Sequence, residues 1–350
     1  MRSVTRRDFH HVILSALGSC TLGSLCSTAY AADDESLTFV HPELRPFAAQ
    51  LMKLAGAMPE LSAQTLAATR QAMGGWAQPP LASPAWAKRL VPGMAGNPPV
   101  TVYVINSTPG AKRPAILHTH GGGFVSGSAS DMLADLQRLA LELNCTIVTV
   151  DYRLAPETTY LGSTKDTYAA LEWLHNQASS LGVDAARIAV MGESAGGGHA
   201  ALLALKAREV GKIALVAQIL IYPMLDDRTG TVTTPPAPIG TIIWNAQKNR
   251  FGWQSFLGQA PGTAQVPVEA VPARCQDLSG LAPAFIGVGS VDLFVNEDIA
   301  YAHRLIDAGV PTQLEVVPGA FHGFDGIGAT TGVAKDFTAA KIKALRQAFA

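Results

Sequence analysis

Residues 188–197 read Ile188-Ala189-Val190-Met191-Gly192-Glu193-Ser194-Ala195-Gly196-Gly197, an apolar run that ends in a G-x-S-x-G pentapeptide. The run predicts a buried strand over 188–191, and the residues after Ser194 predict a helix over 195–209. A strand that turns at once into a helix strains the serine backbone and exposes its hydroxyl, and flanking glycines are needed because a Cβ there would clash. An ordinary glycine-rich turn is the alternative. The strand-turn-helix context favours a nucleophilic serine.

Similar apolar runs, most of them rich in Val and Ile, occur on both sides of this stretch. They predict strands at Thr101–Asn106, Ala115–His120, Thr146–Tyr152, Ala217–Tyr222, Ala284–Gly289 and Thr312–Val317. Helical patterns lie between them, at 131–143, 164–180, 296–308 and 332–349. Strands that alternate with helices predict an α/β fold built on a mostly parallel sheet.

Two segments do not follow this alternation. Residues 33 to about 90 have helical spacing in places, as at Leu51, Leu54 and Met58, and predict one or two helices followed by a loop through Pro79-Pro80 and Pro92. Residues 226–280 form a long insertion that carries Trp244, Phe251, Trp253 and Phe256. Long insertions in α/β folds are often lids. The aromatic residues of this one either line a pocket or attach the lid to the core.

A second motif, His120-Gly121-Gly122-Gly123-Phe124, ends the predicted strand 115–120. Three glycines in a row free backbone N–H groups to point into a cavity, where they can stabilise an oxyanion by about 3–4 kcal/mol per donor. The alternative is a phosphate cradle. No Lys-Ser/Thr follows the glycines, and no G-x-G-x-x-G with its acidic partner occurs, so the oxyanion interpretation is favoured.

A nucleophilic serine needs a general base, and the base needs a carboxylate that orients it. Three histidines follow Ser194 in the chain, and His322 lies in a loop just past the last predicted strand, where α/β catalytic groups sit. His303 falls within a predicted helix and is expected at the surface, whereas His199 is expected in the core. Asp292 follows the strand 284–289 in the same way as His322 follows its strand, and it is the predicted acid.

Glu297 and Asp298 are the other carboxylates close to this strand end. They are expected in the first turn of the next helix, where negative charge is favoured.

Composition bounds the classes of protein that fit. The chain has 350 residues, of which 48% are hydrophobic and 15% charged, so it can bury a large core and is not disordered. The formal net charge is −1, so the composition gives no sign of the excess positive charge that binding to nucleic acid or to an anionic membrane requires. Four Cys exclude a disulfide-stapled small fold, and no paired-Cys zinc spacing occurs.

The N-terminus resembles an export signal. Thr5-Arg6-Arg7-Asp8-Phe9 is a twin-arginine pattern, residues 12–25 are apolar, and Ala29-Tyr30-Ala31 fits a cleavage site. The apolar run is too short for a stable membrane span. An ordinary secretory signal is one alternative, and a lipoprotein signal at Leu17-Gly18-Ser19-Cys20 is a weaker one. The expected location is the periplasm or the medium.

Cleavage after Ala31 would leave Cys145 and Cys275. An oxidising periplasm permits one disulfide between them, and the sequence does not decide whether it forms. Two buried thiols are favoured, because Cys145 leads straight into an apolar strand.

The motifs together resemble one family. HGGGF at 120–124, DYRLAPE at 151–157, GESAGG at 192–197, YPMLDDR at 222–228, Val291-Asp292 and FHGF at 321–324 occur in this order. This set resembles the bacterial hormone-sensitive-lipase-like carboxylesterases of the α/β-hydrolase superfamily, and the likeness runs from about residue 95 to 350. Two departures are Glu193, where members usually carry Asp or Thr, and the missing Phe-Pro after Glu157.

The resemblance implies an α/β-hydrolase fold with a mostly parallel eight-stranded sheet, flanking helices and a helical cap. It divides the chain into a signal peptide (1–31), N-terminal cap helices and linker (32–95), and a catalytic domain (96–350) with a cap insertion at about 228–280. It assigns Ser194, Asp292 and His322 as the triad, and Gly122, Gly123 and Ala195 as oxyanion N–H donors, with Gly121 a weaker candidate. The polar side chains of YRLAPE and YPMLDDR are expected to be structural.

The implied activity is hydrolysis of short- to medium-chain carboxylic esters through an acyl-enzyme, with a small-molecule ester as substrate and with no metal and no organic cofactor. An amide- or lactone-cleaving hydrolase would use the same triad, and a non-enzymatic ligand-binding relative is the remaining alternative. Family analogy also raises a homodimer paired through the edge strand near Thr312–Val317.

Overall fold

The computed structural model describes residues 37–56, 59–74 and 77–350. The expected signal peptide, residues 1–31, lies outside the described residues. Among the described residues no helix combines the length and the apolar character that crossing a bilayer requires.

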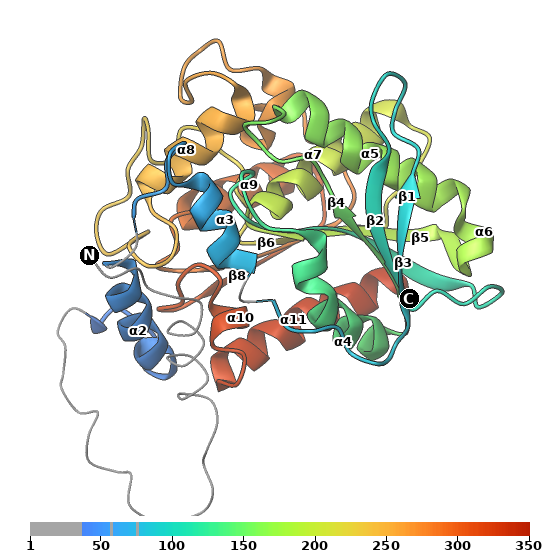
Figure 1. Ribbon diagram of the computed structural model, residues 1–350, viewed down its shortest axis with the longest axis horizontal. Helices are drawn as coiled ribbons and strands as arrows, with labels where there is room; N and C mark the ends of the chain where they lie inside the picture. The colour runs from blue at the N-terminus through green and yellow to red at the C-terminus, as the bar shows by residue number, and fades with distance from the viewer. Residues whose placement is uncertain (1–36, 57–58, 75–76) are drawn as a thin grey trace, which may run out of the picture. The chain divides into compact units, whose positions relative to one another are not determined.

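An eight-stranded sheet forms the centre of the structure (Figure 1). Its strand order is β1-β2-β4-β3-β5-β6-β7-β8, and every pair from β4 to β8 is parallel. Seven strands are those that the apolar runs predict: β2 (Val100–Ile105), β3 (Arg113–Thr119), β4 (Thr146–Asp151), β5 (Val183–Glu193), β6 (Ala217–Ile221), β7 (Ala284–Gly289) and β8 (Thr312–Val317).

The eighth strand, β1 (Trp86–Val91), was not predicted. It pairs antiparallel with β2 at one edge of the sheet, in the region where the sequence predicts only helices and a loop. Only Val91 of this strand is buried, and Lys88 and Arg89 lie on it. An edge strand that faces water lacks the continuous apolar run that identifies the inner strands.

Helices cover both faces of the sheet (Figure 1). On one face α5 (Tyr160–Asn176), α7 (Ala195–Val210) and α9 (Val295–Asp307) pack on apolar residues of the strands. On the other face α4 (Leu133–Leu143) and α11 (Gly332–Phe349) enclose a second core, together with the short α10 (Phe324–Ile327). The inner Val- and Ile-rich strands are therefore buried from both sides, as the sequence predicts, whereas the edge strand β8 has only one buried residue, Val317.

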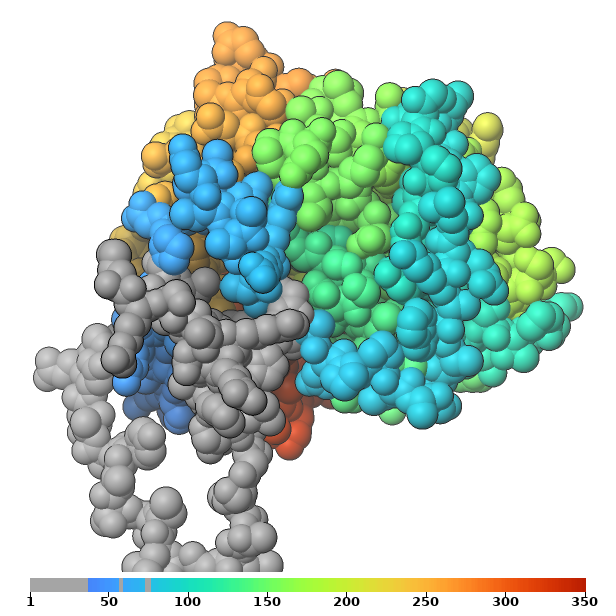
Figure 2. All heavy atoms as spheres, in the orientation of Figure 1, coloured from blue at the N-terminus to red at the C-terminus, as the bar shows by residue number. Residues whose placement is uncertain are grey.

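Both segments in which the sequence predicts a cap supply helices. The N-terminal segment supplies α2 (Arg45–Ala55) and α3 (Leu66–Gly74), and the insertion supplies α8 (Ala246–Leu257). Leu61 and Leu66 share one apolar cluster with Trp253 and Phe256 of α8. Gln247 on α8 donates a 2.6 Å hydrogen bond to Glu60. Figure 2 shows α3, in light blue, bordering the orange insertion on one face.

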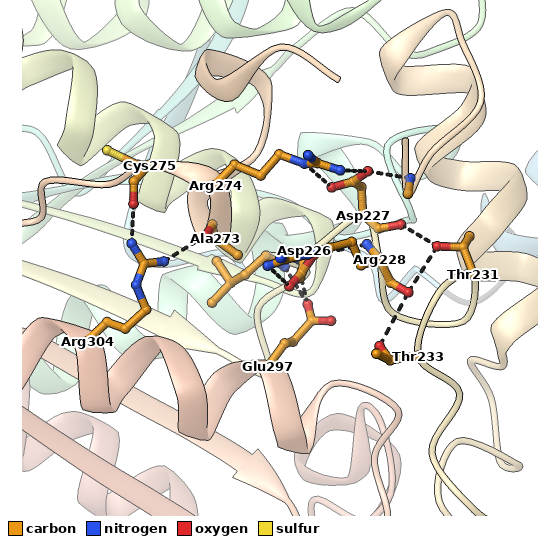
Figure 3. Close-up of polar contacts among 12 residues, drawn as sticks. Asp226, Asp227, Arg228, Thr231, Thr233, Ala273, Arg274, Cys275, Glu297 and Arg304 are labelled. Carbon is orange, nitrogen blue, oxygen red and sulfur yellow. Dashed lines mark hydrogen bonds and ion pairs between the residues drawn. The ribbon is translucent and has the colours of Figure 1, made fainter. Parts of the chain in front are cut away.

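The insertion is tied down at its base by the YPMLDDR segment (Figure 3). Asp227 is fully buried, and its carboxylate accepts hydrogen bonds from Arg274 Nε and Nη2 at 2.6 and 2.9 Å. The same carboxylate accepts from the backbone N–H of Gly262 at 2.6 Å. This bidentate pair joins the start of the insertion to its end, so the structural role expected for this segment is confirmed for Asp227.

Helix α9 holds the insertion from the other side (Figure 3). Glu297 Oε1 accepts from the N–H groups of Leu225 and Asp226 at 2.6 and 3.1 Å, and Arg304 donates to the carbonyls of Ala273 and Cys275. Glu297 lies in the first turn of α9, as predicted, and so does Asp298. Both are buried, however, and burial raises the pKa of both carboxyls well above their usual range, so their surroundings disfavour the negative charge that the helix end favours.

Cys145 and Cys275 are free thiols in the structure. Cys145 is buried, as expected, and burial raises the pKa of its thiol to about 12. Cys275 is only half-buried, and its thiol donates to the carbonyl of Asp277. The expectation of two buried thiols is therefore right for Cys145 alone.

The two arginine pairs of this region make a matched comparison. Removing Arg274 leaves Asp227 buried without its partner, so we expect Arg274→Ala to lower the free energy of unfolding by about 3 kcal/mol. Arg228 pairs with Asp226, but 45% of its side chain is exposed, so Arg228→Ala should cost no more than about 1 kcal/mol. Urea denaturation measures both, and equal losses would contradict the assigned role of Asp227.

Candidate active site

Ser194 sits at the turn between β5 and α7 in a backbone conformation that L residues rarely adopt. Its φ is 58° and its ψ is −123°. Three backbone hydrogen bonds hold it there: its N–H donates to Ile221 O at 2.9 Å, and its carbonyl accepts from Gly198 N and Met224 N at 3.0 and 2.9 Å. The predicted strained turn is therefore present, and β6 and the segment that follows it help to fix it.

The turn lies directly against the end of β3. A Cβ on Gly196 would be 2.0 Å from the Thr119 carbonyl oxygen, so only glycine permits this approach. Thr119 Oγ1 donates a 2.7 Å hydrogen bond to Gly196 O. The start of α7 is thus fixed to the strand that leads into the glycine triplet.

The structure brings Ser194, His322 and Asp292 into one hydrogen-bonded chain. His322 Nε2 lies 2.9 Å from Ser194 Oγ, and His322 Nδ1 lies 2.7 Å from Asp292 Oδ2. All three residues are buried: Ser194 and His322 are 7% exposed and Asp292 is 1% exposed. The other oxygen of Asp292 accepts from the N–H of Phe294 at 3.0 Å. The carboxylate is therefore oriented by the backbone and in turn orients the imidazole.

Two aromatic rings pack edge-on against the His322 imidazole. Tyr222, just past β6, has its ring centroid 4.8 Å from that of His322, and Phe294 has its centroid at 5.2 Å. The Tyr222 hydroxyl donates to Asp325 at 2.8 Å, which holds the ring in place. These contacts shield the His322–Asp292 pair from water and limit rotation of the imidazole.

The glycine triplet runs beside the serine. A Cβ on Gly121 would lie 3.4 Å from Ser194 Cβ, which places this backbone next to the Ser194 side chain. In the described part of the chain, the N–H groups of Gly122, Gly123 and Ala195 donate to no protein acceptor. Ala195 begins α7, whose first N–H groups have no partner within the helix.

Tyr152 supports the start of the glycine loop. Its hydroxyl donates a 2.6 Å hydrogen bond to His120 O, and its ring stacks on the His120 imidazole at 4.2 Å. Burial lowers the pKa of His120 to about 4, so the ring is neutral near pH 7 and its Nδ1–H donates to Gly121 O at 2.8 Å. The YRLAPE segment thus has the structural role expected of it.

Glu193, the residue that departs from the family pattern, pairs with a histidine. His118 Nε2 lies 2.8 Å from the Glu193 carboxylate, and His118 Nδ1 lies 2.8 Å from Thr149 Oγ1. Burial opposes the charge on Glu193, but His118, Lys341 and a backbone hydrogen bond together keep the pKa of that carboxyl below its usual range. The longer side chain of Glu193 is therefore accommodated by a hydrogen bond with His118 of β3.

The two other histidines after Ser194 lie where the sequence predicted. His199 is fully buried among the rings of Phe124, Tyr152 and Phe256, and burial lowers its pKa to about 3. The side chain of His303 is 74% exposed and faces Asp307.

For two aromatic residues of the insertion the structure shows one of the two roles left open by the sequence, attachment of the insertion to the core. Trp253 and Phe256 are fully buried, and Phe256 stacks on Phe124 at 3.9 Å, so they attach the insertion to the core. Trp244 is half-buried, and a Cβ on Gly123 would lie 2.2 Å from its ring. Trp244 therefore covers the glycine loop directly.

Comparison with known proteins places this arrangement in a family. Residues 116–326 match the model of a family with the alpha/beta hydrolase fold. Esterase LipI of Mycobacterium tuberculosis is 34% identical over 67% of this chain and 73% of its own length. Ethyl acetate hydrolase of Pseudomonas putida is 32% identical over the same shares. The solved structure titled Bacterial Heroin Esterase has a TM-score of 0.77 and 33% identity, covering 90% of this chain and 99% of that one.

The chain belongs to the hormone-sensitive-lipase-like carboxylesterases of the α/β-hydrolase superfamily. It is a carboxylic ester hydrolase.

Two contacts of this carboxylesterase's site were not found from the sequence. Arg70 of α3 reaches the loop that carries the glycine triplet, and its Nε donates to Val125 O at 2.6 Å. Trp244 lies against Gly123, but in the sequence it is only one of several aromatic residues of the insertion. Both make contacts that are distant in the sequence, and no local pattern marks either of them.

Asp292 offers a test of how the histidine is oriented. Asn has nearly the same size, but its amide group would favour the wrong imidazole tautomer, so we expect Asp292→Asn to lower kcat for an ester by about 10⁴-fold. Stopped-flow or steady-state assays with a p-nitrophenyl ester measure the loss. A near-normal kcat in Asp292→Asn would contradict the role of Asp292 in orienting His322.

Proposed function

We propose that this protein is a serine carboxylesterase that hydrolyses short- to medium-chain esters, with Ser194 as nucleophile and His322 and Asp292 as its partners. The observation that carries the proposal is the chain of hydrogen bonds at 2.9 and 2.7 Å, which starts from a serine held in a strained turn. This geometry fits a serine whose proton can pass to a histidine. The N–H groups of Gly122, Gly123 and Ala195 are the proposed oxyanion donors.

The proposed reaction has two steps. His322 Nε2 takes the Ser194 proton as Oγ attacks the ester carbonyl carbon, and the oxyanion forms against the N–H donors. Asp292 stabilises the imidazolium. His322 then protonates the leaving alcohol, which yields the acyl-enzyme. Water attacks the acyl carbonyl, its proton passes to His322, and the acid leaves as Ser194 regains its proton.

Two observations support the proposed preference for small acyl groups. One relative is named for ethyl acetate, a short ester. The site is also closely covered: Ser194 and His322 are each 7% exposed, and Trp244 lies on the glycine loop. A nucleophile covered in this way favours acyl chains that need little room.

A p-nitrophenyl ester series from acetate to palmitate tests this function. We expect kcat/KM to peak at short to medium chains, and Ser194→Ala to lose about 10⁶-fold in kcat while its melting temperature stays near that of the wild type. Matched anilide and lactone substrates separate the amidase and lactonase alternatives. A folded wild type that turns over an anilide or a lactone, but no ester of the series, would overturn the proposal.

We propose further that the protein is exported through a twin-arginine signal, on the basis of Arg6-Arg7 and the apolar segment that follows. Replacing both arginines by lysine keeps the charge but removes the pair. Cell fractionation should then find the unprocessed precursor in the cytoplasm of the bacterial host. Normal export of the lysine variant would instead indicate an ordinary secretory signal.

A further inference from the structure

Arg70 connects the cap helix α3 to three groups near the glycine loop. Its Nε donates to Val125 O at 2.6 Å, and its Nη2 donates to Ala155 O at 2.9 Å. Both terminal nitrogens also bind Glu157, at 2.6 and 2.8 Å. These acceptors lie 55, 85 and 87 residues away in the sequence. One guanidinium therefore joins the cap to two separate segments of the catalytic domain.

Val125 belongs to the tight turn that contains Gly122 and Gly123. Gly122 O accepts from the N–H groups of Val125 and Ser126 at 3.1 and 3.0 Å. Gly122 and Gly123 both have positive φ, of 124° and 62°. The direction of their N–H groups therefore depends on how the turn is held. Arg70 contributes by binding the carbonyl of Val125, which belongs to the same turn.

Ala155 braces the same turn. Its N–H donates to Phe124 O at 2.9 Å, and its own carbonyl accepts from Arg70. The two residues that follow the triplet are therefore both held through their carbonyls, Phe124 by Ala155 and Val125 by Arg70. Glu157 keeps the guanidinium plane aligned, and hydrogen bonding from Arg70 lowers the pKa of Glu157 to about 2, so the pair stays charged at neutral pH. Lysine could not reproduce this fork, because it presents a single point charge.

We propose that Arg70 is a positioning residue for the oxyanion turn, so that the N-terminal cap contributes to transition-state stabilisation as well as covering the site. This proposal rests on the proposed function. Arg70 is assigned no contact with the substrate. It acts by holding Val125, and through Val125 the N–H groups of Gly122 and Gly123, in the orientation that the oxyanion requires.

A positioning role predicts a loss confined to the transition state. Removing one oxyanion donor costs about 10²–10³-fold in kcat in a known hydrolase. Because Arg70→Ala only loosens the turn, we expect kcat for p-nitrophenyl butyrate to fall about ten- to hundredfold with KM within about twofold. Arg70→Lys should recover only a small part. The inhibition constant of a trifluoromethyl ketone, which forms the tetrahedral adduct, should rise by a factor similar to the loss in kcat/KM.

Two further variants separate positioning from simple support of the cap. Leu66→Ala removes a buried apolar contact of α3 but leaves the guanidinium in place, and it should lower the melting temperature without the kcat loss. Arg45→Ala is the matched arginine control, because Arg45 also binds backbone carbonyls, those of Thr38 and Val40. It should leave kcat and the inhibition constant unchanged.

The outcomes are distinct. Wild-type turnover with unchanged kcat and ketone binding in Arg70→Ala would overturn the positioning role and leave the proposed function intact. Equal kcat losses in Leu66→Ala and Arg70→Ala would also overturn it, in favour of a packing role for α3. Absence of ester turnover by the wild type would overturn both proposals.

Discussion

The positive-φ backbone of Ser194 is the constraint on which the rest of the site depends. A strained conformation of this kind costs about 1–3 kcal/mol. Three backbone hydrogen bonds, to Ile221 and from Gly198 and Met224, each contribute about 0.5–1.5 kcal/mol net, so together they can offset the strain. The close approach of Gly196 to Thr119 adds a steric limit. These contacts hold the Ser194 backbone in its strained conformation, and this conformation places the hydroxyl beside His322.

The parallel sheet explains why residues far apart in the chain meet at this serine. The glycine triplet follows β3, Ser194 follows β5, Asp292 follows β7 and His322 follows β8. Parallel strands end at one edge of the sheet, so four loops converge there. Tyr152 and Glu193 then connect the glycine loop and the turn to the strands beneath them. The chemistry proposed for the site therefore uses the same contacts that stabilise the fold.

Much of this could be predicted from the sequence, because the inner strands are continuous apolar runs and Ser194 and Asp292 each follow one of them. His322 follows the edge strand β8, which is less apolar but is still recognised by its place after the helical pattern at 296–308. The strand β1 could not be predicted, because it is mostly exposed and carries Lys88 and Arg89, so its sequence resembles that of a loop. Arg70 could not either, because its partners are 55 or more residues away and a lone arginine on a short helix carries no pattern. The half-burial of Cys275 depends likewise on how the insertion folds back.

The proposed chemistry requires that Ser194, and no other residue, is the activated nucleophile. The most direct test is covalent trapping of the wild-type protein with a p-nitrophenyl phosphonate ester, followed by intact-mass measurement and peptide mapping. We expect one phosphonyl group per chain, located on Ser194, with release of one equivalent of p-nitrophenol. A phosphonyl group on a different residue, or no adduct on a folded protein that hydrolyses esters, would contradict it.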